Sequence, residues 1–283
     1  IEESARDILH KLNTFSLPFA KPETYIAIEA AKQAGEAVLQ IYQKGFTVEY
    51  KEEKEPITIA DTTSNAIIIK YLKKTNHPIL SEESPDDKQR LSFDKVWIID
   101  PLDGTSDFVN KTGEFSVMIG FVENNIPTIG VIYRPDNQEL FVAEKDNGAF
   151  KINKGKVEKL RVDTNIDIMR AVVSRHHLTH HEKDFLEKIG VSDFKQKGSC
   201  GLKVADICSN KSELYFTTTN KIKQWDSCAA HCLITESGGK VSDMFGNEIK
   251  YNTNKINHEF GLLFSNGKTH SEIVKKYVLH YTD

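Results

Sequence analysis

The feature that most constrains this chain is a pair of carboxylates placed directly after a strongly apolar run. The run covers residues 96–99 and predicts a short buried strand, and Asp100 and Asp103 follow it at once. Two carboxylates so close in sequence, where a buried strand opens into a turn, can converge on one point. Burying several carboxylates without cations is very costly. Because a hard divalent ion removes that cost, and because all-oxygen ligation favours Mg²⁺ or Mn²⁺ over zinc, the pair predicts such a metal site.

The residues around this pair favour a tight turn that faces an anion. Pro101 restricts the turn, and Gly104 permits a close approach of the backbone because it has no side chain. Thr105 and the N–H groups that follow it can face an anion, as the N-termini of helices do. A cation site beside an anion site is therefore expected in this segment.

Three further acidic segments have a similar placement, at the end of a strand or the start of a helix. Taken singly, an aspartate at a helix N-cap is usually only a cap, and a pair of glutamates after a strand is usually a solvated loop. Their combination with Asp100 and Asp103 favours one shared site. The segments are Glu82 and Glu83 after a predicted strand at residues 78–80, Asp226 as the N-cap of a helix over residues 226–237, and Asp61 at the start of another helix.

Hydrophobic periodicity predicts an α/β protein in two parts. The first part begins with a helix over residues 22–44, which Gly45 ends, and continues to a β-meander over residues 115–152. The polar residues 153–156 are the best candidate for a boundary, so the expected domains are residues 1–154 and 155–283. The second part alternates strands and helices, which favours layers. Its expected strands cover residues 171–173, 214–216 and 261–264, and its expected helices cover residues 180–189, 202–209, 226–237 and 271–279.

Composition narrows the class of protein. The chain has 37 Lys and Arg residues against 41 Asp and Glu residues and no basic block, which argues against nonspecific binding to nucleic acid. No apolar run approaches the ~18 residues that a membrane span requires, so no membrane association is expected. Four cysteines in 283 residues are too sparse for a disulfide scaffold, and no signal peptide is visible. The expected location is the cytoplasm.

Four motifs together resemble the inositol monophosphatase superfamily. They stand in the family's order within roughly residues 26–246, and they are residues 58–61, 81–84, 97–105 and 225–226. The resemblance implies a layered α/β/α/β/α sandwich of the sugar-phosphatase type, in which the site lies between the two halves. It also implies a Mg²⁺-dependent, lithium-sensitive phosphomonoesterase.

Within that superfamily the chain is most similar to the 3′(2′),5′-bisphosphate nucleotidases. The similar segments are residues 110–117, 174–177, 198–203, 222–229 and 238–240. Inositol monophosphatases carry an acidic residue where this chain has Thr219, which counts against inositol phosphate as the substrate. One departure counts the other way, since some nucleotidases have an arginine where this chain has Phe216 and Thr217.

The resemblance implies a reaction of sulfur metabolism, the hydrolysis of the 3′-phosphate of adenosine 3′,5′-bisphosphate to AMP and phosphate. The partner is then a small phosphorylated substrate rather than nucleic acid. Two alternatives stay open. One is an inositol monophosphatase or a fructose-1,6-bisphosphatase-like sugar phosphatase on the same scaffold. The other is a non-catalytic sensor of Mg²⁺ or nucleotide, which the complete set of acidic residues disfavours.

The same resemblance implies two or three Mg²⁺ ions, for which Mn²⁺ is a possible substitute. The first ion would lie between Glu82, Asp100 and the Leu102 carbonyl group. The second would lie between Asp100, Asp103 and Asp226. A third, weaker ion would contact Glu82 and water, which makes Glu82 both a metal ligand and a catalytic residue.

Other residues receive roles in catalysis and substrate binding by the same resemblance. Thr105, hydrogen-bonded to Asp61, would orient the attacking water and help to deprotonate it. The N–H groups of Gly104 and Thr105 would bind the phosphate. His177 and Lys203 are the candidates for holding the nucleotide, against the alternative that Lys203 is only on the solvated face of its helix.

Two expectations concern the surroundings of the site. In the resembling family the region at residues 49–55 tends to cover the site, so this segment is either a lid or a solvated loop. The nucleotidase branch is often monomeric and inositol monophosphatases are commonly dimers, which favours a monomer over a homodimer.

Overall fold

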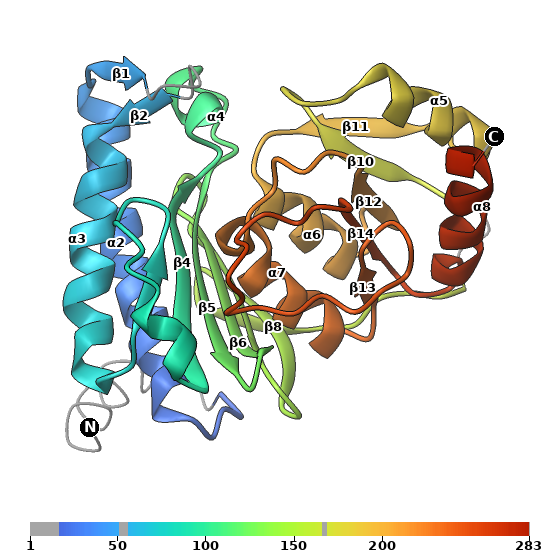
Figure 1. Cartoon of the computed structure of the whole chain (residues 1–283). Coiled ribbons are helices and arrows are strands. Elements are labelled where there is room, and N and C mark those ends of the chain that lie inside the picture. The colour runs from blue at the N-terminus through green and yellow to red at the C-terminus, as the bar shows by residue number, and fades with distance from the viewer. Residues whose placement is uncertain (1–16, 51–55, 166–168, 283) are drawn as a thin grey trace.

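The computed structural model describes residues 17–50, 56–165 and 169–282. In these ranges, helices and sheets alternate in five layers, with a helix pair outside each of two sheets and a third pair between them (Figure 1). This α/β/α/β/α order confirms the predicted fold class. Most of the segment considered above as a lid, residues 51–55, lies outside the described ranges.

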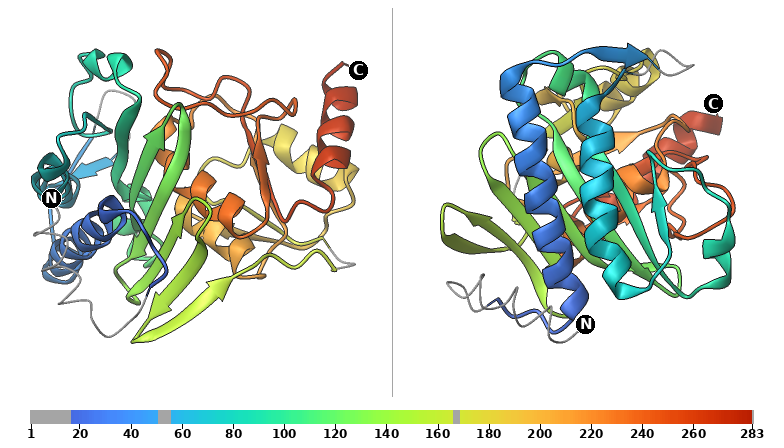
Figure 2. Two further views of the ribbon diagram at one scale, coloured as in Figure 1. Left: turned by 90° about the horizontal axis from the view of Figure 1, so that it is seen from below. Right: turned by 90° about the vertical axis from the view of Figure 1, so that its left-hand side faces the viewer.

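The first two layers are a helix pair and a seven-stranded sheet. α2 (Pro22–Lys44) has the predicted bounds and lies beside α3 (Ile59–Leu72) on the outer face of the sheet (Figure 2). The strand order is β3-β4-β5-β6-β7-β8-β9, in which β3 and β4 are parallel and the other neighbours are antiparallel. The strands are β3 (Ile79–Ser81), β4 (Lys95–Asp103), β5 (Ser116–Glu123), β6 (Ile126–Arg134), β7 (Glu139–Glu144), β8 (Gly148–Asn153) and β9 (Lys156–Leu160).

The predicted meander is confirmed, and it extends one strand further than predicted. β9 pairs with β8 through a hairpin whose ends are Asn153 and Lys156, so the residues expected at a domain boundary form a turn within the first sheet. β9 was missed because its lysines and glutamate leave most of the strand exposed and polar. The chain leaves this sheet after Leu160, and the division into two domains stays a prediction.

The inner helices and the second sheet form the next two layers. α6 (Cys200–Cys208) and α7 (Gln224–Glu236) lie between the sheets. The second sheet has the order β11-β10-β12-β14-β13, parallel from β11 to β12 and antiparallel beyond it. Its strands are β10 (Ala171–Ser174), β11 (Phe194–Lys197), β12 (Leu214–Thr217), β13 (Lys240–Ser242) and β14 (Leu262–Ser265).

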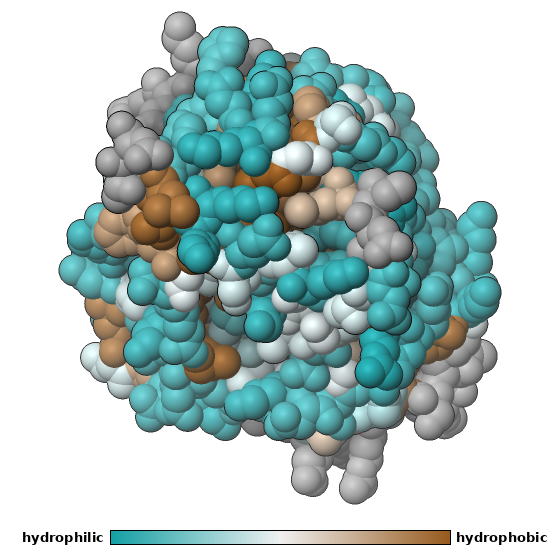
Figure 3. All heavy atoms as spheres, turned by 90° about the vertical axis from the view of Figure 1, so that its right-hand side faces the viewer, coloured by the Kyte–Doolittle hydropathy of each residue, from teal (hydrophilic) through white to brown (hydrophobic). Residues whose placement is uncertain are grey.

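The last layer is formed by α5 (His180–Lys188) and α8 (His270–Thr282). Their apolar residues pack with β10, β12 and β14 in a core cluster of their own. The outer face here is largely hydrophilic, with only small hydrophobic groups between the polar side chains (Figure 3). Among the described residues, no helix combines the length and the apolar character that crossing a membrane requires.

The predicted elements of the second half are present, with ends displaced by at most three residues. The strands missed there, β11 and β13, are short and partly exposed. The remaining short elements are β1 (Val48–Tyr50), β2 (Pro56–Thr58), α4 (Thr105–Val109) and the 3₁₀ turns η1 (Lys73–Thr75) and η2 (Gln89–Ser92).

Three acidic residues occupy local positions that differ from those predicted. Asp100 and Asp103 lie within β4 rather than in a turn after it, because the strand continues through an irregular register opposite β5. Asp226 is not an N-cap, because α7 begins two residues before it. Its carboxylate instead accepts a hydrogen bond from the backbone N–H of Lys223, at 2.6 Å. A carboxylate can accept hydrogen bonds from free backbone N–H groups either at the N-cap or at the third residue of a helix. The sequence pattern alone therefore does not tell which of the two positions Asp226 occupies.

The placement of α7 depends on two glycines in the first sheet. A Cβ atom at Gly130 would lie 2.3 Å from the Ala229 carbonyl oxygen, and one at Gly120 would lie 2.4 Å from the Cys228 sulfur. Both approaches are closer than non-bonded atoms tolerate. The missing side chains therefore allow α7, which carries Asp226, to lie directly on β5 and β6.

We expect Gly130→Ala to lower the free energy of unfolding by about 1–3 kcal/mol, because the added methyl group forces α7 away from the sheet. Urea unfolding followed by circular dichroism measures this change. Lys156→Ala, on the exposed part of β9, is the control and should change stability by less than about 0.5 kcal/mol. Equal stabilities of wild type and Gly130→Ala would show that the helix does not pack as closely as described.

Candidate active site

One cavity of about 320 Å³ collects almost all of the residues predicted for the site. Its size is within the range of sites for small ligands. It lies between the two halves of the molecule, where the end of β4 meets the first turns of α6 and α7. The predicted residues that line it are Glu82, Asp100, Leu102, Asp103, Gly104, Thr105, His177, Lys203 and Asp226. Asp61 does not line the cavity, but it accepts a hydrogen bond from Thr105, which does.

Three carboxylates from distant parts of the chain converge at the cavity. Glu82, Asp100 and Asp226 each offer an oxygen, and these oxygens all lie within 4.8 Å of one another. Asp100 is only 1% exposed, and its pKa is raised well above the ordinary value by burial and by the charges of Glu82, Asp103 and Asp226. The pKa of Asp226 is raised as well, first by burial and then by the charge of Glu82.

This cluster fits a divalent metal ion. Its donors are all oxygen atoms, which suit Mg²⁺ or Mn²⁺, and their mutual repulsion is what a bound cation relieves. The raised pKa values of Asp100 and Asp226 express first the cost of burying these charges and then their repulsion by neighbouring carboxylates. We therefore expect metal binding to release protons.

Asp103 lies in the same cavity but is engaged by the N-terminus of α6. Its carboxylate accepts hydrogen bonds from the backbone N–H groups of Cys200, at 3.0 Å, and Gly201, at 2.8 Å. The hydroxyl groups of Ser199 and Ser116 also donate to it. Asp103 is thus outside the group of three carboxylates, and it ties the end of β4 to a helix of the second half. Its role as a metal ligand stays a prediction.

Asp61 and Thr105 are in contact, as the resemblance implied. The Thr105 hydroxyl lies 3.1 Å from Asp61 Oδ1 and 3.0 Å from the Leu102 carbonyl oxygen. The other Asp61 oxygen accepts hydrogen bonds from the N–H and hydroxyl groups of Thr58, at 2.7 and 2.8 Å. Burial raises the pKa of Asp61, which the bonds from Thr58 oppose. The carboxylate is therefore held in one orientation, with one oxygen directed toward Thr105.

Gly104 makes the close backbone approach that its sequence position predicted. Its φ is +92°, in the left-handed region that favours glycine, and a Cβ atom there would lie 2.9 Å from the Glu114 carbonyl oxygen. The chain can therefore turn from β4 directly into α4. Gly104 and Thr105 line the cavity beside the three carboxylates.

Lys203 and His177 come from the second half of the molecule. Lys203 is only 2% exposed, so it is not on a solvated helix face. Its ammonium group donates to the Gly198 carbonyl oxygen at 2.6 Å and lies 4.9 Å from the centre of the Tyr215 ring. Burial lowers its pKa. His177 is exposed at the end of β10, and its backbone N–H donates to Ser174 Oγ at 3.1 Å.

Several residues of the cavity had no role in the sequence-based assignment. Lys221 and Lys223 line it from the segment before Trp225, and Asp107 lines it from α4. The two lysines stand beside the Trp-Asp motif, so a search for cations near that motif would have found them. Asp107 has no such signal, because its partners are distant in sequence. Thr219, where the resemblance led us to expect an acidic residue in an inositol monophosphatase, also lines the cavity.

Comparison with known proteins places the chain in one family. A model of the inositol monophosphatase family matches residues 20–280. The 3′(2′),5′-bisphosphate nucleotidase CysQ of Buchnera aphidicola is 34% identical over 230 residues, which cover 79% of this chain and 85% of that protein. CysQ of Escherichia coli K12 is 31% identical over 231 residues, covering 79% and 91%.

Solved structures agree with this placement. CysQ of Bacteroides thetaiotaomicron, a bacterial member of the inositol monophosphatase family, has a TM-score of 0.77 and 28% identity, covering 88% of this chain and 98% of that chain. An IMPase of Thermotoga maritima has a TM-score of 0.76 and 26% identity, covering 90% and 96%. The fold therefore does not by itself separate nucleotidases from inositol monophosphatases. By sequence and by structure, this chain belongs to the inositol monophosphatase family.

Proposed function

We propose that this chain is a 3′(2′),5′-bisphosphate nucleotidase that hydrolyses the 3′-phosphate of adenosine 3′,5′-bisphosphate to AMP and phosphate. The observation that carries the proposal is the convergence of Glu82, Asp100 and Asp226 at a cavity that Lys203 also lines. The relatives named CysQ support the choice of substrate. Thr219 supports it too, because the cavity lacks a carboxylate at that position.

Members of this family depend on metal ions, generally Mg²⁺. A first ion would be held by Glu82, Asp100 and the Leu102 carbonyl group, and a second would be held by Asp100, Asp103 and Asp226. A third, weaker ion at Glu82 and the use of Mn²⁺ in place of Mg²⁺ belong to the same proposal. Bound divalent ions supply Lewis-acid chemistry, since they neutralise phosphoryl oxygens and lower the pKa of water.

The remaining steps belong to the chain's own residues. With its proton directed to Asp61 Oδ1, the Thr105 hydroxyl can accept a hydrogen bond from the attacking water and so orient it. The proton released in the attack passes to the Thr105 hydroxyl oxygen while the Thr105 proton passes to Asp61 Oδ1. The Gly104 and Thr105 N–H groups hold the phosphoryl oxygens. The bond between phosphorus and the 3′ oxygen then breaks. That oxygen takes up a proton from bulk water, and Asp61 returns its proton to bulk water, so the protons balance.

We assign the nucleoside to the wall formed by the second half. Lys203 supplies a cation that is already fixed in place by Gly198, and His177 supplies an exposed ring at the rim. Lithium sensitivity, a cytoplasmic location and a monomeric state complete the proposal.

A sugar phosphatase is the second candidate, because the IMPase of Thermotoga maritima matches the fold as well as CysQ does. Rates with adenosine 3′,5′-bisphosphate, inositol 1-phosphate and fructose 1,6-bisphosphate, measured in Mg²⁺ with and without Li⁺, separate the two. We expect kcat/KM to be at least about tenfold higher for the nucleotide, which is about 1.4 kcal/mol of transition-state binding. Excess EDTA should abolish all activity.

A higher kcat/KM for inositol 1-phosphate or fructose 1,6-bisphosphate would refute the nucleotidase assignment. It would not contradict the metal site. Full activity in excess EDTA would refute the metal site itself. Absence of turnover with all three substrates, together with Mg²⁺ binding, would favour the non-catalytic sensor.

A further inference from the structure

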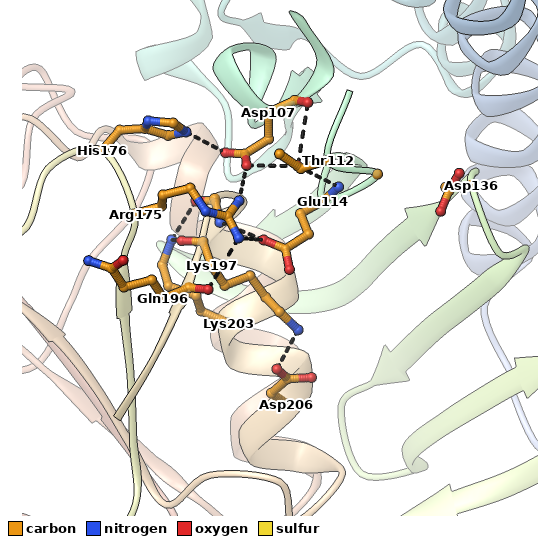
Figure 4. Close-up of polar contacts among 12 residues, drawn as sticks. Asp107, Thr112, Glu114, Asp136, Arg175, His176, Gln196, Lys197, Lys203 and Asp206 are labelled. Atoms are coloured by element: carbon orange, nitrogen blue, oxygen red, sulfur yellow. Dashed lines mark hydrogen bonds and ion pairs between the residues drawn. The ribbon is translucent and has the colours of Figure 1, made fainter. Parts of the chain in front are cut away.

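Asp107 has no part in the reaction described above, yet its carboxylate makes several hydrogen bonds and ion pairs. It lies in the first turn of α4, directly after the phosphate-binding segment, and its side chain is fully buried. It accepts hydrogen bonds from Thr112 Oγ1 at 2.8 Å, from His176 Nε2 at 2.8 Å and from Arg175 Nη1 (Figure 4). Two of these partners belong to the second half of the molecule.

Arg175 is in turn fixed to both halves. Its second guanidinium nitrogen lies 2.7 Å from Glu114 Oε2 and donates to the Gln196 carbonyl oxygen at 3.3 Å. Its backbone N–H donates to the Lys197 carbonyl oxygen at 3.1 Å. A guanidinium group held by two carboxylates and a carbonyl group has little freedom to move. The end of β10 is therefore fastened to the segment around α4.

Gly198 brings this network to the wall of the cavity. A Cβ atom at Gly198 would lie 1.7 Å from Asp107 Oδ2, so the two residues are in direct contact. The Gly198 N–H lies 3.3 Å from Glu114 Oε2, and its carbonyl oxygen accepts the ammonium group of Lys203 at 2.6 Å. One buried carboxylate thus contacts both His176, the neighbour of His177, and the residue that positions Lys203.

We propose that Asp107 is a positioning residue that sets the separation between the phosphate-binding segment and the wall carrying His177 and Lys203, and so gives the enzyme its preference for nucleotides over small phosphate esters. The inference rests on the proposed function, because it takes that wall as the nucleoside site. A small ester occupies only the phosphate end of the cavity, whereas a nucleotide must reach both ends at once.

The physical argument is one of preorganisation. A displacement of about 1 Å between reacting groups and binding groups can reduce a rate by about 10². Substituting Asp107 by asparagine keeps the size of the side chain and removes the charge that holds Arg175 and His176. The phosphate-binding segment and the wall carrying His177 and Lys203 are then held less firmly at their proper separation. This lowers kcat/KM only for substrates that contact both.

The test compares adenosine 3′,5′-bisphosphate with glycerol 2-phosphate in Mg²⁺. We expect Asp107→Asn to lower the ratio of their kcat/KM values by at least about tenfold. The matched control is Asp206→Asn, because Asp206 pairs with Lys197 entirely within the second half and does not line the cavity (Figure 4). The ratio should be unchanged in this control.

If Asp107 only stabilises the fold, both kcat/KM values fall together and the ratio is unchanged, which overturns the proposal. Arg175→Lys weakens the same link from the other side, because the single nitrogen of lysine cannot reproduce the contacts of the guanidinium group with Asp107 and Glu114. This variant replaces Asp107→Asn in the test if Asp107→Asn does not fold. In the double variant the loss should be smaller than the product of the single losses. If wild type prefers a sugar phosphate, the proposed function fails and this inference fails with it. If wild type prefers the nucleotide and Asp107→Asn leaves the ratio unchanged, only the inference fails.

Discussion

Asp100→Asn is expected to reduce Mg²⁺-dependent phosphate release by at least about 10³-fold and, in metal-free protein, to raise the melting temperature by about 2–4 °C. The first effect follows because Asp100 is the most buried member of the three-carboxylate cluster and a predicted ligand of two ions. The second follows because its charge is destabilising when no cation is present.

The sign of the stability effect comes from the pKa shift. The pKa of Asp100 is raised in the folded state by burial and by neighbouring carboxylates, so folding favours the protonated form. The ionised form therefore destabilises the folded state at neutral pH, and this penalty disappears as the pH falls below the unfolded value near about 4. The asparagine variant carries no such penalty, so its advantage in melting temperature should shrink toward that pH.

Asp243→Asn is the matched control, since Asp243 is also a buried aspartate but lies away from the cavity. Its carboxylate accepts bonds from Phe245 and Asn247, so removing the charge should lower the melting temperature and leave activity intact. Calorimetry in EDTA and phosphate release in Mg²⁺ measure the two quantities. Normal turnover by Asp100→Asn, or a lower melting temperature without metal, would contradict the metal-site account.

The second large effect is expected at Thr105. Thr105→Val keeps the shape of the side chain and removes the hydroxyl that bridges toward Asp61 and the Leu102 carbonyl group. We expect kcat to fall by about 10²–10⁴, the range attributed to a positioned acid or base. The affinity for Mg²⁺ should change little, because the three carboxylates of the cluster are untouched.

Thr105→Ser keeps the hydroxyl and should retain kcat within about tenfold, which makes it the control for loss of packing. Single-turnover kinetics at saturating substrate separate the chemical step from product release. If the valine variant turns over as fast as wild type, Thr105 does not orient the attacking water.

Much of this fold was predictable because its signals are local. The helix over residues 22–44 begins with a proline, ends at a glycine and has a clear apolar face, and the structure has the same bounds. The polar strands β9, β11 and β13 were missed because they lie at or near sheet edges, where pairing rather than side-chain burial defines the strand.

The candidate site was predictable only in part, because some of its residues are defined by partners that are distant in sequence. Glu82 follows β3, Asp100 lies near the end of β4 and Asp226 lies in the first turn of α7. Such positions converge in layered α/β folds. Asp103 had an additional partner in the N-terminus of α6, which no spacing in the sequence indicates. Asp107 was missed altogether, because its proposed positioning role depends on contacts with Arg175 and His176, which are distant in sequence.

Anomalous diffraction from crystals soaked in Mn²⁺ is the measurement that tests the central claim most directly. We expect peaks in contact with the carboxylates of Glu82, Asp100 and Asp226, and their loss in crystals of Asp100→Asn. Crystals of an active enzyme that hold no manganese at this cluster under saturating Mn²⁺ would contradict the assignment of these side chains to a metal centre.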